Sequence, residues 1–155
     1  KGMLVETTKP AWTHQGVLGN LMMSWHHADP KRKWGRIIHL FQFRVAKGEM
    51  RKPDLMFRLR STPETGTNYY WDSADLIMEV VSRDSRPYDL KKKREYASAG
   101  VSEYWIVDPQ KETITVQVLK KNSYSVHGEF KKGQKANSKL LPGFSVDVKA
   151  ALEAK

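Results

Sequence analysis

Two short apolar runs separated by one predicted helix constrain the fold of this chain more than any other feature. Residues 74–82 read ADLIMEVVS and residues 102–109 read SEYWIVDP, and such runs are typical of strands buried on both faces. Residues 82–100 predict a helix between them, with Pro87 near its first turn and Gly100 at its end. A helix that joins two buried strands implies a crossover between parallel neighbours.

The remaining patterns place other strands before and after this crossover. They predict a helix over 13–28, strands over 37–46 and 54–60 with a turn at 47–53, a loop over 60–73, a hairpin of strands over 112–120 and 123–130, and a terminal helix within 140–155. The strands on either side of the first turn should pair as an antiparallel hairpin or lie next to each other. The order as a whole predicts an α/β fold, in which helices cover both faces of a mixed sheet.

Length and composition limit the class of protein. The chain has 155 residues, which suits a single domain over 1–155. Position 1 is lysine rather than methionine, so an N-terminal element can be missing. The absence of cysteine excludes disulfides and cysteine-rich zinc sites, and fits an intracellular, cytoplasmic setting. No apolar run approaches the ~20 residues of a membrane-spanning helix, and no signal peptide is visible.

The charge balance points to polyanionic partners. Lysine and arginine number 27 against 17 acidic residues, a formal net charge of +10. This excess favours nucleic acid first and an anionic membrane second. A protein that simply has a high pI is an equally weighted alternative.

One carboxylate interrupts the first apolar run. Glu79 lies among Ile77, Met78, Val80 and Val81, where its burial is costly unless it is paired, hydrogen-bonded or bound to metal.

A second carboxylate, Asp54, opens an earlier strand and would approach Glu79 if the two strands are neighbours. Mg²⁺ or Mn²⁺ could then neutralise both groups. On spacing alone, the favoured alternative is that Asp54 caps a turn and Glu79 pairs with a buried basic side chain.

The predicted helix that follows carries a second candidate group. Lys92 and Tyr96 are four residues apart and therefore share one helix face. The run KKKR is typical of a solvated basic face, which suits Lys91 and Lys93 better than Lys92. His14, near the start of the first predicted helix, has only a weak claim to the same site, and the histidines as a set lack a zinc-ligand spacing.

Four segments of the chain resemble one known family. The segments KPDLMF, ADLIMEVVSRDS, YDLKKKREYASAGVSEYWIVDP and LPGFSVDV are similar to a family of small restriction-endonuclease-like proteins, Uma-type, in the PD-(D/E)XK nuclease superfamily. The likeness runs from about His14 to the last predicted helix. It implies a restriction-endonuclease-like core with an added C-terminal β-hairpin.

The resemblance implies a role for each candidate residue. Asp54 and Glu79 match the metal ligands of the family, which implies Mg²⁺ or Mn²⁺ as cofactor. The superfamily lysine is expected two residues after the glutamate, where this chain has Val81. Lys92 matches a lysine that the family carries on the next helix, with Lys91 and Lys93 as alternatives. Tyr96 would support Lys92 or contact a phosphate.

The implied activity is divalent-metal-dependent endonuclease cleavage of DNA phosphodiester bonds. A homodimer is expected because cutting both strands requires two sites, and the hairpin over 112–130 is its candidate interface. Tyr70 and Trp71 could stack on bases, although ordinary packing is favoured. Basic residues expected to bind backbone phosphates are Lys31, Arg32, Lys33, Arg58, Arg60 and Arg83.

Two other functions stay open. The first is a nuclease-like fold that binds nucleic acid without cleavage, because Val81 replaces the expected lysine. The second is a non-catalytic α/β oligomerisation module in which the acidic residues are structural.

Overall fold

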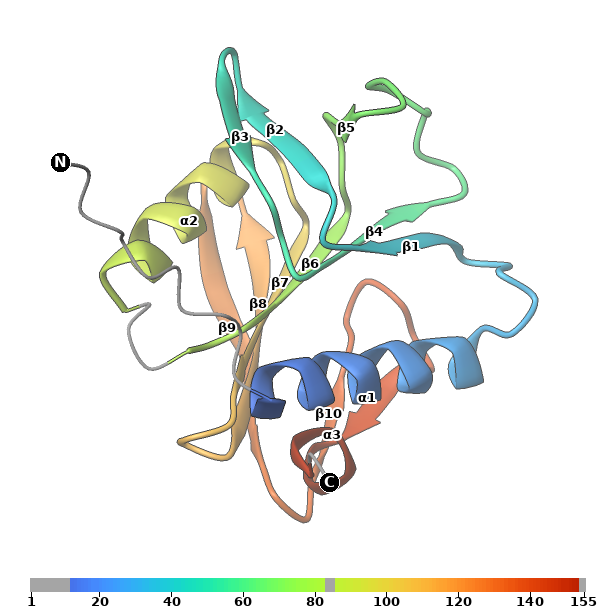
Figure 1. Ribbon diagram of the computed structural model, residues 1–155, viewed down its shortest axis with the longest axis vertical. Helices are drawn as coiled ribbons and strands as arrows, with labels where there is room; N and C mark the ends of the chain where they lie inside the picture. Colours follow the sequence, from blue (N-terminus) through green and yellow to red (C-terminus); the bar gives the residue numbers. More distant parts are fainter. Residues whose placement is uncertain (1–11, 83–85, 154–155) are drawn as a thin grey trace, which may run out of the picture.

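A six-stranded mixed sheet forms the centre of the molecule in a computed structural model that describes residues 12–82 and 86–153 (Figure 1). The order of its strands is β1-β4-β6-β7-β8-β9. These strands are β1 (Gly35–His39), β4 (Leu55–Leu59), β6 (Leu76–Val80), β7 (Glu103–Asp108), β8 (Thr113–Lys120) and β9 (Ser123–Lys131).

The predicted parallel crossover is confirmed. Strand β6 pairs in parallel with β7, and α2 (Arg86–Ser98) connects them. All five residues of β6 are buried, as a strand covered on both faces requires. Beyond the helix, Gly100 adopts φ 79°, a left-handed conformation that glycine accepts without steric cost.

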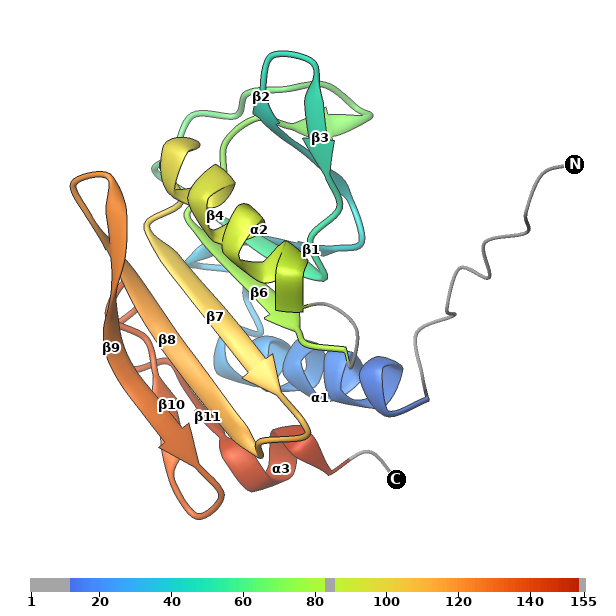
Figure 2. The ribbon, with the colours of Figure 1, turned by 90° about the vertical axis from the view of Figure 1, so that its left-hand side faces the viewer.

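Helices cover both faces of the sheet, as the sequence predicts (Figures 1 and 2). The side chains of β6 alternate between the two resulting cores. Met78 packs in the cluster that contains Trp25 of α1 (Trp12–Ala28), on the face that α3 (Val148–Leu152) also covers. Ile77 packs in the opposite cluster, which contains Tyr96 of α2.

The single strand predicted over 37–46 is wrong. The chain forms β1, breaks at Leu40, which has φ 49°, and continues as β2 (Gln42–Ala46) in another sheet. There β2 pairs with β3 (Glu49–Arg51) and β5 (Tyr70–Trp71), in segments predicted as turn and loop. Alternating apolar residues run through the break without glycine or proline, so periodicity alone cannot reveal it.

Both ends of the sheet agree with the predicted pairings. Strand β1 pairs antiparallel with β4, and β4 pairs antiparallel with β6. Strands β8 and β9 form the expected hairpin.

The C-terminal segment adds a small sheet that the sequence reading missed. Strands β10 (Lys135–Asn137) and β11 (Ser145–Asp147) pair antiparallel before the short α3, whose N-cap is Asp147. In the described part of the chain, no helix is long and apolar enough to cross a membrane.

Candidate active site

Asp54 and Glu79 lie opposite each other on neighbouring strands. Leu55 pairs with Met78 in the antiparallel register of β4 and β6, which brings Asp54 level with Glu79. Both carboxylates are buried, with 8% and 7% of their surfaces exposed. The Oδ2 atom of Asp54 accepts a hydrogen bond of 2.8 Å from the backbone N–H of Val80.

Lys92 and Tyr96 contact the same oxygen of Glu79. The Tyr96 hydroxyl donates to Glu79 Oε1 at 2.6 Å, and Lys92 Nζ lies 3.7 Å from that atom. Lys91 instead faces Glu95 at 3.9 Å, with 68% of its side chain exposed. Of the two, Lys92 is the one that the helix directs to Glu79.

An ion pair anchors α2 above the sheet. Arg51, on β3, donates two hydrogen bonds to Glu95, of 2.7 Å to Oε2 and 2.5 Å to Oε1. The Tyr96 ring is buried between Phe43 and Tyr104, at centroid distances of 6.2 and 5.3 Å. These contacts fix the rotation of the helix about its axis and hold its inward face against β6.

His14 on α1 contacts one of these two carboxylates, Asp54. Its Nε2 atom lies 3.3 Å from Asp54 Oδ2. The hydrogen bond with Asp54 is the main reason that the His14 pKa is raised, although burial opposes the shift. Its Nδ1 atom is buried without a hydrogen-bond partner. The sequence gives only one signal for this contact, a histidine near a helix start.

The charge at Glu79 is only partly compensated. Burial is the largest cause that raises the pKa of Glu79, to about 7, and the nearby Asp54 carboxylate raises it further. Lys92 and the Tyr96 hydrogen bond act in the opposite direction. Burial also raises the pKa of Tyr96, so the phenol keeps its proton and remains a donor.

A divalent cation fits this donor set. The two buried carboxylates are hard oxygen ligands, and the negative charge of Asp54 is one of the causes that raise the pKa of Glu79. Within residues 12–82 and 86–153, no group of three or more histidine or acidic side chains is placed to hold a metal. Mg²⁺ is commonly bound through one or two carboxylates and completes its coordination with water and phosphate, and such an ion would suit this pair.

The predicted phosphate-binding residues gather away from the carboxylates. Arg58 lies on β4, is 6% exposed and places its guanidinium 4.1 Å from the centre of the Trp71 ring. Arg60 donates to the backbone carbonyl of Arg32 at 2.8 Å.

The other basic residues and the two aromatic residues expected to contact nucleic acid have different surroundings. Lys31 and Lys33 are exposed after α1, and Arg83 lies outside the described residues. Tyr70 packs against Arg44 at 5.1 Å. Ordinary packing therefore accounts for Tyr70, and Trp71 likewise packs against Arg58.

Comparison with known proteins identifies the family. The model of the Uma2 family, described as "Putative restriction endonuclease", matches residues 1–149. The chain belongs to the Uma2 family. This confirms the resemblance read from the sequence and supports a nuclease-like function for this Uma2 chain.

A solved structure supports the fold of the Uma2 chain. A protein from Anabaena variabilis, described as a putative nuclease belonging to DUF820, aligns with a TM-score of 0.71 at 15% identity. The alignment covers 90% of this chain and 80% of that chain. At this identity the likeness establishes the fold alone. No curated protein matches this chain.

Proposed function

We propose that this Uma2 chain is a divalent-metal-dependent endonuclease that hydrolyses phosphodiester bonds in DNA. The observation that carries the proposal is the contact of one buried carboxylate, Glu79, with both Lys92 and Tyr96, beside Asp54. Acidic residues with a perturbed pKa and an adjacent cation are characteristic of sites that carry out chemistry. Family membership gives independent support for a nuclease-like function.

Each residue has a distinct role in this proposal. A Mg²⁺ or Mn²⁺ ion held by Asp54 and Glu79 would polarise the scissile phosphate and lower the pKa of the attacking water. Lys92 supplies positive charge where negative charge develops on the phosphate. Tyr96 remains protonated and fixes Glu79 Oε1, while the Val80 N–H fixes Asp54 Oδ2. His14 contacts Asp54 and acts as a positioning residue.

Plasmid nicking tests this proposal directly. Wild type is compared with Asp54→Asn, Glu79→Gln and Lys92→Met in Mg²⁺, in Mn²⁺ and in EDTA. Each of the three variants should lose at least ~100-fold in rate, because electrostatic groups at a transition state contribute on this scale. Lys91→Met is the matched control, since its side chain is exposed and directed to Glu95. Metal-dependent cutting that survives Glu79→Gln would place the chemistry elsewhere.

Binding without cleavage is the second candidate function. Val81, half-buried directly after β6, occupies the position two residues after Glu79 where a lysine is expected. DNA binding with no cutting in any metal would favour this candidate. Neither binding nor cutting would favour a non-catalytic module.

A homodimer and a cytoplasmic location belong to the same proposal. Strand β9 is at one edge of the sheet, and Val126 on it is 62% exposed. Pairing of two hairpins over 112–130 would cover this edge. Light scattering at micromolar protein should give twice the chain mass of 17.9 kDa, and Val126→Lys should return it to the monomer value. The cytoplasmic location remains a prediction from the absence of cysteine.

A further inference from the structure

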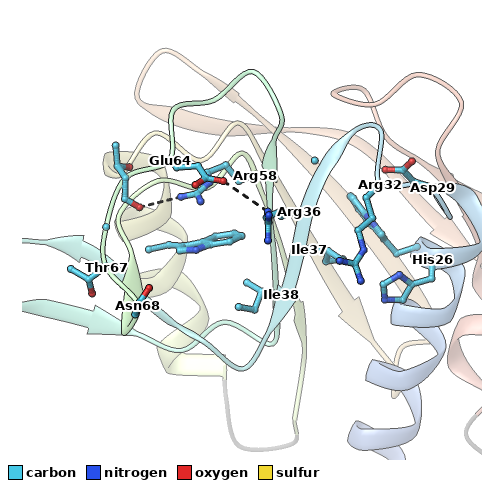
Figure 3. Close-up of a pocket in the computed structure, with 15 residues that line it drawn as sticks. His26, Asp29, Arg32, Arg36, Ile37, Ile38, Arg58, Glu64, Thr67 and Asn68 are labelled. Atoms are coloured by element: carbon cyan, nitrogen blue, oxygen red, sulfur yellow. Dashed lines mark hydrogen bonds and ion pairs between the residues drawn. The ribbon is translucent and has the colours of Figure 1, made fainter.

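Two adjoining pockets lie along the outer edge of β1, between the end of α1 and the loop after β4. Figure 3 shows the larger of the two. Their volumes are about 520 and 250 Å³. Both are lined by Arg32, Arg36 and Arg58, and the smaller one also by Arg60. We call the two pockets together the arginine groove.

Arg58 is a buried cation without a carboxylate partner among the described residues. Only 6% of its surface is exposed. Its Nη1 atom donates 3.1 Å to the backbone carbonyl of Thr65, and its guanidinium stacks 4.1 Å from the Trp71 ring centre. The ring face offsets part of the cost of burial. A buried charge is nevertheless costly unless it is paired, so this guanidinium is suited to bind an anion.

The two acidic residues that line the larger pocket form one ion pair with its arginines among the described residues, and that pair is exposed. Asp29 uses both carboxylate oxygens to accept the backbone N–H groups of Lys33 and Trp34, at 2.7 and 2.9 Å. Glu64 lies 3.9 Å from Arg36, but the two side chains are 76% and 72% exposed. An exposed pair of this kind is weak and is readily exchanged for another anion.

We propose that the arginine groove binds the phosphate backbone of a DNA strand, a subsite separate from the catalytic carboxylates. The choice of DNA rests on the proposed function. Guanidinium groups match phosphate oxygens in geometry as well as in charge. An edge lined by several of them gives affinity without base recognition.

The position of the groove suits a long substrate. Asp54, directly before β4, and Arg58 on β4 are four residues apart and project to one side of the strand, roughly 13 Å apart at about 3.3 Å per residue. This span equals about four nucleotide steps of a DNA strand at 3.4 Å each. Met56, between them, is buried in the same cluster as Phe43 of the small sheet, which keeps the two places distinct.

Fluorescence anisotropy with a labelled 20-base-pair duplex in EDTA tests the groove without cleavage. Arg36→Gln and Arg32→Gln, both at exposed side chains, should each weaken binding about 3- to 10-fold. Each should also reduce the slope of log affinity against log salt by about 1, as the loss of one phosphate contact predicts. Arg58→Met should weaken binding more than ~10-fold, and its melting temperature establishes that the variant is folded.

Lys149→Gln is the control, because this lysine of α3 is 66% exposed and lines neither pocket. An unchanged salt slope in Arg36→Gln, an equal loss of affinity in Lys149→Gln, or no binding by wild type would overturn the groove. An Arg58 Nε–H NMR signal that shifts on titration with inorganic phosphate but not with DNA would also overturn the groove.

The groove and the proposed function can fail separately. If Glu79→Gln abolishes cutting while the arginine variants bind normally, the nuclease stands and the groove is wrong. If the arginine variants lose binding while no metal supports cutting, the groove stands and the nuclease is wrong.

Discussion

Glu79 and Glu103 are both buried glutamates on neighbouring central strands, and their surroundings differ. Glu103, 1% exposed, accepts four hydrogen bonds, from Trp105 Nε1, the Ser138 hydroxyl and two backbone N–H groups of the loop after β10. Glu79 instead faces another carboxylate and has a raised pKa. The first arrangement stabilises the fold, whereas the second retains unbalanced charge for which a cation is the natural partner.

Replacing Glu103 should therefore cost much more stability than replacing Glu79. Glu103→Ala leaves two buried and two partly buried donors without this acceptor and should lower the free energy of unfolding by at least ~3 kcal/mol. Glu79→Gln should cost little in metal-free protein at pH 8, because it removes a charge that Asp54 repels. Urea unfolding of both variants measures the difference. A larger loss for Glu79→Gln than for Glu103→Ala would contradict this contrast.

The pKa of Glu79 also predicts a pH dependence of stability. Its value rises from 4.5 to about 7 in the folded chain, so the folded state binds the proton more tightly. This proton binding therefore adds to the free energy of unfolding by roughly 3 kcal/mol at most. The contribution is fully present below pH 4.5 and is lost as the pH rises through 7. His14 changes stability in the same direction, because its pKa is also raised.

Urea unfolding in EDTA between pH 5 and 8 is the measurement for this dependence. The difference between wild type and Glu79→Gln isolates the glutamate from His14. If the free energy of unfolding depends on pH in the same way in both proteins, the pKa of Glu79 is not raised in the folded chain.

At the scale of the element, α2 depends on its anchor to the small sheet. Arg51 and Glu95 join β3 to the helix face that carries Lys92. The ion pair therefore connects the small sheet of β2, β3 and β5, which sequence periodicity did not predict, to the helix that carries Lys92.

Loss of this anchor should reduce activity more than stability. Arg51→Met should lower the single-turnover cleavage rate about 10-fold, because misplacement of a catalytic group is costly. It should lower the free energy of unfolding by only about 1 kcal/mol, because the pair is partly exposed. Arg51→Lys, which keeps one contact, should recover part of the rate. An unchanged rate in Arg51→Met would show that the anchor does not position Lys92.

The packing of strand β1 against β4 depends on glycine at position 35. A Cβ atom there would collide with the backbone carbonyl of Arg58 on β4. The close approach of β1 and β4 that forms the wall of the arginine groove therefore requires glycine at this position.

At the scale of the whole molecule, cation binding should be linked to folding. Asp54 and Glu79 come from strands that meet only in the folded chain, so an ion bound by both should stabilise that state. Mg²⁺ at 10 mM should raise the melting temperature of wild type by several degrees. The rise should be larger at pH 8 than at pH 6, because Glu79 must lose its proton to bind.

Differential scanning calorimetry of wild type and Asp54→Asn, with and without Mg²⁺, measures this linkage. Asp54→Asn should show no Mg²⁺-dependent rise at either pH. An equal rise in both proteins would point to binding at another place.

Features that depend on residues close together in the chain were predicted correctly from the sequence, whereas features set by distant segments were not. The crossover from β6 to β7 and the shared face of Lys92 and Tyr96 follow from periodicity over a few residues. The break at Leu40 and the strands β10 and β11 do not, because their boundaries are set by packing against distant segments. The family resemblance predicted that Asp54 and Glu79 act together as metal ligands, whereas spacing alone favoured separate roles.

The sequence by itself determined that a glutamate sits in a buried central strand and that one helix face brings a lysine and a phenol towards it. Only the tertiary structure decided which partners surround that glutamate. The register of β4 on β6 places Asp54 opposite it, and α1 brings His14 from far along the chain. The arginine groove arises in the same way, at a sheet edge where three separate segments meet. Strand pairing and helix packing join residues that no local pattern connects, and the cost of burying their charges makes such meeting points candidates for function.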